Sequence, residues 1–324
     1  MAGQRLSVAM CTFNGVRYLE EQLDSIAAQS RRPDELVICD DHSGDFTEAI
    51  IKDFAARAAF PVRLSVNEKN LGSTVNFEKA ISLCTGEIIA LSDQDDVWRP
   101  DKLSLLEDCF RESPGAGLVF SDAEVVDENI RPKGYRLWQV KGFKSAEKKK
   151  IVKGRAAEVL LKRNVVTGAT MAFKAKYRDL LRPFPPNWVH DAWIALMVAS
   201  CADLAFIDKP LIKYRQHHGQ QLGAKKSGFL SQAIDSSRTG PDIYSCQLRR
   251  YEEARDRLAA NVDFLRNKKV VSQIDSKIAH LKTRSSMPGS GFRRLVFVFR
   301  ELVTLRYHLY SQGWKSVAKD LFLC

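Results

Sequence analysis

The chain has 324 residues, of which 45% are hydrophobic and 27% are charged, and its formal net charge is +11. This composition supports a folded core and excludes a disordered, collagen-like or acidic-tail protein. The seven cysteines form no C-x-x-C pair, and no stretch reaches the ~18 consecutive apolar residues of a membrane-spanning helix. The N-terminal residues show no signal-peptide pattern, so we expect a cytoplasmic protein with reduced thiols.

The N-terminal third alternates between short apolar runs and helical periodicity. Apolar runs predict buried strands, and apolar residues at helical spacing predict amphipathic helices between them. In chain order the pattern predicts strand, helix, strand, helix, strand, helix and strand over residues 5–11, 16–29, 35–39, 46–59, 62–66, 76–84 and 88–92. Alternation of this kind indicates an α/β fold with a largely parallel sheet, covered by helices on both faces.

The rest of the chain combines a basic stretch, an apolar helix and two amphipathic helical segments. Residues 131–157 are basic and poorly periodic, which predicts an exposed loop. Residues 192–202 are apolar enough to predict a buried helix. Helical stripes over 248–265 and 295–310, separated by a linker at 286–291, predict a helical C-terminal region.

Charge divides the chain into two predicted regions. Residues 1–220 contain 31 Lys and Arg against 30 Asp and Glu, whereas residues 221–324 contain 19 against 9. We therefore predict an α/β domain over the first region and a basic, amphipathic helical region over the second. A basic region of this kind can bind an anionic membrane or an acidic partner, or form a solvated helix face. No pattern of an RNA-recognition, KH or zinc-finger module is present, so no nucleic-acid partner is expected.

Three predicted strands end in polar residues suited to binding a nucleotide. The segments that hold them are residues 11–15, 40–45 and 92–96. Ligands of open α/β sheets bind at the carboxyl ends of the strands. The third segment contains Asp93, Asp95 and Asp96, whose carboxylates repel one another unless a cation or hydrogen-bond donors compensate. Mg²⁺ and Mn²⁺ bridge such carboxylates to substrate phosphates, although an Asp-rich turn that caps the next helix has the same composition.

Four motifs, in order along the chain, resemble one enzyme family. They are Val-Ala-Met-Cys-Thr-Phe-Asn-Gly at 8–15, Val-Ile-Cys-Asp-Asp-His-Ser-Gly-Asp at 37–45, Asn-Leu-Gly-Ser at 70–73 and Leu-Ser-Asp-Gln-Asp-Asp-Val-Trp at 91–98. Together they resemble the family 2 inverting glycosyltransferases of the GT-A fold. The residues around Asp93 resemble the rhamnosyltransferase-like branch of bacterial surface-polysaccharide synthesis. The resemblance covers roughly residues 5–220 and implies a mostly parallel sheet flanked by helices.

The resemblance implies roles for five residues of the donor pocket. Thr12 and Asn14 should line the nucleotide pocket, and Asp41 should accept a hydrogen bond from the imide N–H of uracil or thymine. Asp93 should face the ribose and the metal shell, and Asp95 should bind a Mn²⁺ or Mg²⁺ ion that bridges the diphosphate. Helix capping or loop formation remains the alternative role of Thr12, Asn14 and Asp41.

An inverting transferase also needs a general base that accepts the proton of the acceptor hydroxyl. The segment Trp-Val-His-Asp-Ala-Trp at 188–193 is similar to the family's acid–tryptophan motif, which implies that Asp191 is the base. His190 is the alternative base, and a helix cap is the alternative role of Asp191. Residues 167–171 look like the small-residue segment that contacts the donor sugar or the acceptor, or else form a tight turn.

A final motif, Tyr-Arg-Gln-His-His-Gly at 214–219, resembles the family's Tyr-Arg-x-His segment. The resemblance implies that Arg215 neutralises phosphate charge and that His217 completes the metal shell. His218 has the same chemistry and remains the alternative ligand. Surface exposure is the alternative for both histidines.

The function implied is transfer of a sugar, with inversion, from a UDP- or dTDP-sugar to a saccharide acceptor. dTDP-rhamnose is one candidate donor, and a lipid-linked cell-surface polysaccharide intermediate is the expected acceptor. Residues 221–324 would then hold the protein against the inner face of the plasma membrane. One alternative is a sugar-1-phosphate nucleotidyltransferase, whose Gly-rich basic loop is missing from residues 11–17. The other is a non-catalytic basic binding module.

Overall fold

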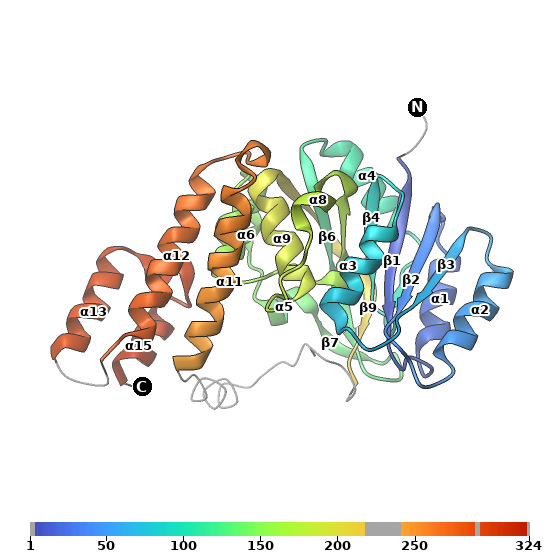
Figure 1. The fold of residues 1–324 in the computed structure, drawn as a ribbon, viewed down its shortest axis with the longest axis horizontal. Helices are drawn as coiled ribbons and strands as arrows, with labels where there is room; N and C mark the ends of the chain where they lie inside the picture. Colours follow the sequence, from blue (N-terminus) through green and yellow to red (C-terminus); the bar gives the residue numbers. More distant parts are fainter. Residues whose placement is uncertain (1–3, 218–240, 289–291, 323–324) are drawn as a thin grey trace.

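The computed structural model describes residues 4–217, 241–288 and 292–322. A mixed sheet forms the centre of the N-terminal part, and helices cover both of its faces (Figure 1). The strands follow the spatial order β3-β2-β1-β4-β8-β6-β9-β5, and β7 pairs with β6. Their bounds are Leu6–Thr12 (β1), Glu35–Asp40 (β2), Val62–Val66 (β3), Ile88–Ser92 (β4), Val97–Trp98 (β5), Ala116–Val126 (β6), Pro132–Arg136 (β7), Met171–Lys174 (β8) and Asp203–Arg215 (β9).

The predicted α/β fold is confirmed, and the first four strands build the larger of its two parallel parts. β3, β2, β1 and β4 pair in parallel, and β6 pairs with β9 in parallel. β8 is antiparallel to both β4 and β6 and joins the two parallel parts. The carboxyl ends of β1, β2 and β4 therefore meet at one edge of the sheet, where ligands of such sheets bind.

Alternation along β1 divides the hydrophobic core into two layers. Leu6, Val8 and Met10 pack with the buried faces of α1 (Leu19–Ala27), α2 (Thr47–Arg57) and α4 (Lys102–Glu112) on one side. Ala9 points to the other side, where α3 (Ser73–Leu83) and the apolar helix α9 (His190–Cys201) cover the sheet. Side chains of successive strand residues point to opposite faces, which is why one strand serves both layers.

The prediction of a loop over residues 131–157 is wrong. This stretch contains β7, α5 (Leu137–Lys141) and α6 (Ser145–Val152), and α7 (Ala156–Lys162) begins within it. Trp138 and Phe143 are buried and meet edge to face, and the Lys148 ammonium group lies 4.6 Å from the centre of the Trp138 ring. A few buried aromatic residues thus hold these short elements against the sheet. In the sequence these aromatic residues stand among many lysines, so the stretch shows no clear helical or strand periodicity.

The C-terminal region is helical, as predicted, and its helices are α11 (Pro241–Ala259), α12 (Lys269–Ser285), α13 (Phe292–Val303), α14 (Arg306–Tyr310) and α15 (Trp314–Phe322). Ala254, Leu258 and Ile274 belong to the same hydrophobic cluster as α7 and α9, so α11 and α12 extend the core of the sheet domain. The predicted boundary at residues 220 and 221, and part of the predicted linker at 286–291, lie outside the described residues. α13 and α15 lie at the end of the molecule farthest from β3 (Figure 1).

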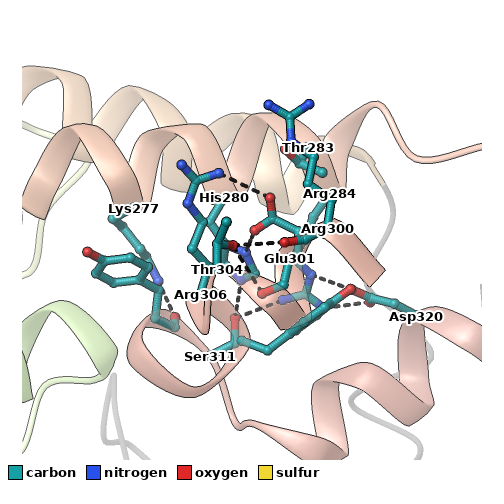
Figure 2. A network of polar contacts seen from close by, with 12 residues as sticks. Lys277, His280, Thr283, Arg284, Arg300, Glu301, Thr304, Arg306, Ser311 and Asp320 are labelled. Carbon is teal, nitrogen blue, oxygen red and sulfur yellow. Dashed lines mark hydrogen bonds and ion pairs between the residues drawn. The ribbon is translucent and has the colours of Figure 1, made fainter. Parts of the chain in front are cut away.

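A buried polar network joins the last four helices (Figure 2). The Nδ1 atom of His280 on α12 lies 2.5 Å from Oε2 of Glu301 on α13, and both side chains are fully buried. Arg284 on α12 forms an ion pair of 2.6 Å with Asp320 on α15, and Arg306 pairs with Glu301 at 3.2 Å. None of the helices in the described part of the chain combines the length and the apolar character needed to span a bilayer.

Candidate active site

A cavity of about 370 Å³ opens at the carboxyl edge of the parallel strands. Its wall draws residues from the ends of β1, β2, β4 and β9 and from the first turn of α9. Six of the eight predicted site residues lie on this wall: Thr12, Asp41, Asp93, Asp95, Asp191 and His217. Asn14 and Arg215 are not part of it. The sequence motifs are scattered over more than half of the chain, but most of the site residues predicted from them lie on the wall of this one cavity.

Asp41 organises the loop that closes one side of the cavity. Its Oδ1 atom accepts hydrogen bonds of 2.8 Å from the Asn67 side chain and from the backbone N–H of Leu71. Its Oδ2 atom accepts one of 2.9 Å from the backbone N–H of Gly72. A carboxylate has about four acceptor positions, so these contacts leave one on Oδ2 for a ligand.

Thr12 and Asn14 connect the ends of β1 and β2. The Thr12 hydroxyl donates a hydrogen bond of 2.7 Å to Asp40. Asn14 has a φ of 47°, its backbone N–H donates to the Ser43 hydroxyl at 2.8 Å, and its Oδ1 atom accepts from the backbone N–H of Gly44 at 2.9 Å. These contacts match the loop-forming alternative for Asn14. Its role in nucleotide binding stays a prediction.

The acidic loop after β4 is held tightly and carries repelling charges. The Gln94 side chain clamps it to the end of β1, because its amide both accepts from and donates to the backbone of Phe13, at 2.8 and 3.0 Å. Burial, together with the charges of Asp95 and Asp191, raises the pKa of Asp93 to about 7. The charges of Asp95 and Asp191 thus disfavour the ionised form of Asp93, and a cation would relieve this repulsion.

His217 and Arg215 meet the acidic loop from the end of β9. The Nε2 atom of His217 lies 2.8 Å from Oδ2 of Asp95, within hydrogen-bond distance. Arg215 is 2% exposed, and its Nε–H donates to the backbone oxygen of Asp95 at 2.7 Å. Its other nitrogens reach the Glu128 backbone oxygen at 2.7 Å and the Glu21 carboxylate. Arg215 therefore supports the loop from behind, and its direct contact with phosphate stays a prediction.

The chemistry of Asp95 and His217 fits a divalent cation. A carboxylate and an imidazole are ligands that Mn²⁺ accepts, and substrate phosphates commonly complete the shell of Mn²⁺ or Mg²⁺. Within the residues that the structure describes, no group of three His, Cys, Asp or Glu side chains has the spacing of a complete metal site. The alternative ligand, His218, lies outside those residues.

Asp191 lies in the first turn of α9, and two neighbours fix its carboxylate. The Asn164 side chain donates a hydrogen bond of 3.1 Å to Oδ1, and the backbone N–H of Gly168 donates one of 3.3 Å to Oδ2. Gly168 belongs to the small-residue segment predicted to contact substrate. Asn164 was not predicted, because it lies in none of the sequence motifs and follows the short helix α7 by only two residues.

His190, the alternative base, is packed more tightly than its neighbour Asp191. It is 7% exposed and stacks on Phe77, with the ring centres 4.0 Å apart. Burial lowers its pKa, which favours the neutral imidazole. Neither ring nitrogen has a hydrogen-bond partner among the described residues. The absence of a side chain on Gly168 makes room for the ring, because a Cβ atom there would lie 2.6 Å from Nε2.

The mixed sheet, with the acidic loop at its carboxyl edge, defines the class of fold, which is the GT-A fold of glycosyltransferases. Residues 7–172, just over half of the chain, match the model of glycosyl transferase family 2. The chain therefore belongs to that family.

Curated relatives match about two thirds of the chain. An uncharacterized protein of Mycobacterium bovis is 28% identical over 222 residues, which are 66% of this chain and 60% of that protein. The chain thus spans about 60% of the length of such relatives. The dTDP-rhamnosyl transferase RfbG of Shigella flexneri is 28% identical over 235 residues, covering 67% of this chain and 75% of its own.

Solved structures extend the likeness in fold to nearly the whole chain. TarS of S. aureus, residues 1–349 in complex with UDP-GlcNAc, aligns with a TM-score of 0.58 and 17% identity over 98% of this chain and 80% of that chain. A mannosyltransferase of Pyrobaculum calidifontis, in complex with GDP-Man and Mn²⁺, aligns with a TM-score of 0.50 and 18% identity over 100% of this chain and 86% of that one. At these sequence identities, the similarity to the two solved structures shows a shared fold and nothing more.

Proposed function

We propose that this protein transfers a sugar from a UDP- or dTDP-linked donor to a saccharide acceptor, with inversion at the anomeric carbon. The observation that carries the proposal is that Asp41, Asp93, Asp95, Asp191 and His217 share one cavity in a family 2 chain. dTDP-rhamnose is our first candidate donor, because a dTDP-rhamnosyl transferase is among the relatives.

The donor would lie between the ends of β1, β2 and β4. The free acceptor position of Asp41 suits the imide N–H of uracil or thymine, and Asp93 would face the ribose. Asp95 and His217 would hold Mn²⁺ or Mg²⁺, a Lewis acid that stabilises negative charge on the departing diphosphate. Arg215 would act through Asp95, whose backbone it holds in place.

The acceptor would approach from the side of α9. The Asp191 carboxylate would take the proton of the attacking hydroxyl as the new bond to the anomeric carbon forms. Asn164 and Gly168 hold both of its oxygens, so the base needs little rearrangement before it reacts. A fixed base of this kind lowers the entropy loss on reaching the transition state.

A panel of donors tests the proposal. The purified protein is incubated with Mn²⁺ and dTDP-rhamnose, UDP-galactose, UDP-glucose or UDP-GlcNAc, and the released nucleoside diphosphate is measured. We expect release from one donor, faster with a saccharide acceptor. Formation of a nucleotide-sugar from a sugar-1-phosphate and a nucleoside triphosphate would favour the nucleotidyltransferase. Failure to bind any nucleotide with Mn²⁺ would favour the binding module.

We also propose that α13–α15 rest on an anionic membrane, which would place the protein at the inner face of the plasma membrane and its active site beside a lipid-linked acceptor. Large apolar side chains on these helices face solvent, with Phe292 80%, Phe299 67% and Trp314 68% exposed. On α13 the exposed apolar residues recur at helical spacing and form one stripe: Phe292, Leu295, Val296, Phe299 and Val303. Amphipathic helices that lie in a membrane interface carry such a stripe.

On the same helices, the acidic residues are buried and the exposed charged residues are basic. The only acids in residues 292–322 are Glu301 and Asp320, and both are buried in the network of Figure 2. The exposed charged residues on this part of the chain, Arg293, Arg300 and Lys315, are all basic. An outer face that is apolar and cationic is complementary to anionic headgroups, which attract each nearby Lys or Arg by about 1 kcal/mol.

Flotation with liposomes tests this surface. We expect the protein to float with phosphatidylglycerol vesicles at low salt, less at high salt, and less with pure phosphatidylcholine. Phe292→Ser with Phe299→Ser should abolish flotation, whereas Phe46→Ser, a residue 76% exposed beside α2, should leave it intact. Dimers that form at micromolar concentration through α13, with no flotation, would instead assign the stripe to a second copy of the chain.

A further inference from the structure

A second cavity, of about 260 Å³, lies where the C-terminal helices meet the sheet domain. Its wall is formed by residues of α7, α9, α11 and α12 and of the segments between α7 and α9. Four basic residues contribute to it, and no carboxylate does: Lys162, Arg163, Arg250 and Lys277. The proposed transfer reaction uses none of these residues.

The positive charges on this wall are poorly compensated. Only Arg163 has an acidic partner among the described residues, Glu147 at 2.6 Å, and the Nε atoms of Arg163 and Arg250 are buried without a hydrogen-bond partner there. Lys277 is 4% exposed and donates to the backbone oxygen of Tyr310 at 2.6 Å. Burial, with a smaller contribution from Arg284, lowers the pKa of Lys277 to about 7.

Lys162 is half-buried, and burial and then the charge of Arg163 lower its pKa. A cation whose charged form is disfavoured by burial and by like charges gains from an anion placed beside it. Within the described part of the chain, the four cations on this wall therefore have too few carboxylates beside them to balance their charge. Two guanidinium groups and two ammonium groups match the several oxygens and the multiple charge of a phosphate better than one carboxylate.

This cationic cavity adjoins the candidate base. Asn164 lies on its wall and donates to Asp191 at 3.1 Å, and Val189 lies on the walls of both cavities. The indole N–H of Trp188 donates to the backbone oxygen of Arg250 at 3.1 Å, which ties α11 to the start of α9. The cavity is thus on the side of Asp191, where the acceptor would enter, rather than on the side of Asp95 and His217.

We propose that the cationic cavity binds a phosphate group of the acceptor. The proposal rests on the function proposed above, because it uses Asp191 to identify the acceptor side. Two sources have this chemistry: the diphosphate that joins a saccharide to a lipid, and a phosphodiester within a saccharide chain. In either case the cations hold the acceptor by its phosphate while a nearby hydroxyl faces Asp191.

Calorimetric titration with two small probes tests the site. Pyrophosphate represents the lipid diphosphate, and dimethyl phosphate represents the phosphodiester; EDTA removes metal so that the donor site cannot hold either probe through a cation. We expect the wild type to bind one probe, and Arg250→Gln or Lys162→Gln to weaken binding by about ten-fold or more. Arg249→Gln, an exposed neighbour on the same helix, is the matched control and should bind as the wild type does.

The preferred probe identifies the source of the phosphate. No heat from either probe with the wild type, or equal affinities of the wild type, Arg250→Gln and Lys162→Gln, would overturn the proposal. Donor turnover is measured in parallel. Probe binding without turnover of any donor would support the anion site and contradict the proposed transferase function. Turnover without probe binding would support the transferase function and contradict the anion site. Equal thermal unfolding of Arg250→Gln and Arg249→Gln would show that lost binding is not lost folding.

Discussion

The Nε2 atom of His217 lies 2.8 Å from Oδ2 of Asp95, although 122 residues separate them in the chain. The cause is the antiparallel pairing of β5 with β9, in which Val97 faces Lys213 and Trp98 faces Ile212. Continued by two residues, this register brings Asp95 opposite Arg215, which lies two residues before His217. A two-residue strand thus positions the candidate metal ligands.

Asp95→Asn should weaken metal-dependent donor binding. The substitution keeps the size of the side chain but removes the charge that would hold Mn²⁺, so we expect the affinity for UDP or dTDP with Mn²⁺ to fall by about 10- to 100-fold. Calorimetric titration with and without Mn²⁺ measures the effect. Asp53→Asn, an exposed acid on α2, is the control. Unchanged Mn²⁺-dependent affinity in Asp95→Asn would remove this residue from the metal site.

Asp191→Asn should retain donor binding but lose turnover. An amide cannot accept the proton of the acceptor hydroxyl, so we expect kcat to fall by about 10²- to 10⁴-fold while donor affinity stays nearly constant. Initial rates of nucleoside diphosphate release at saturating donor measure kcat. Asp179→Asn, an exposed acid on the short helix α8 (Arg178–Leu181), should keep full activity. Wild-type rates in Asp191→Asn would direct attention to His190.

Gly168→Ala should disturb the position of the candidate base Asp191 without changing the Asp191 side chain itself. The new Cβ atom would lie 2.6 Å from Nε2 of His190, which cannot move freely because it stacks on Phe77. The backbone of residue 168 must shift instead, and its N–H then loses the Asp191 carboxylate. We expect a kcat about ten-fold lower, since small displacements of catalytic groups have effects of this order or larger.

Gly44→Ala is the matched control for that experiment. Gly44 lies in the loop after β2, where its N–H donates to Asn14, but a Cβ atom there would meet nothing within 4 Å. Its activity should therefore equal that of the wild type. Equal rates of Gly168→Ala and Gly44→Ala would show that the contact between Gly168 and Asp191 does not position the base.

Glu35→Gln should change how stability depends on pH. Burial opposes ionisation of Glu35, but hydrogen bonds from Ser7 and Thr85 and the charge of Arg63 outweigh it and lower its pKa from 4.5 to about 2. A lowered pKa stabilises the fold above pH 4.5, and this contribution disappears as the pH falls towards 2. From the shift we expect a loss of about 3 kcal/mol in the free energy of unfolding at pH 7.

Urea unfolding at pH 7 and at pH 3 measures that difference. The gap between the wild type and Glu35→Gln should shrink as the pH is lowered, because the wild type loses the ionised form. Glu20→Gln, an exposed residue on α1, should show little difference from the wild type at either pH. A gap that is constant with pH would mean that the contacts of Glu35 do not depend on its charge.

The sequence predicted the parts of the fold that depend on local patterns. β3 and β4 occupy the residues expected from their apolar runs, and the acidic loop follows β4 as its motif requires. The alternation of apolar and polar residues depends only on neighbouring positions, so it can be recognised without knowledge of the rest of the chain. The same holds for the helical C-terminal region, whose stripes recur every three or four residues.

By itself, the sequence determined the class of fold, the family and six of the residues that line the cavity, because strand ends of a parallel sheet share one edge. The tertiary structure alone decided that Arg215 lies behind Asp95, that Asn164 holds Asp191, and that Glu301 and Asp320 turn inward. These contacts join residues far apart in the chain, and which of them form depends on the pairing of strands and the packing of helices. Local patterns carry no information on the direction of such side chains.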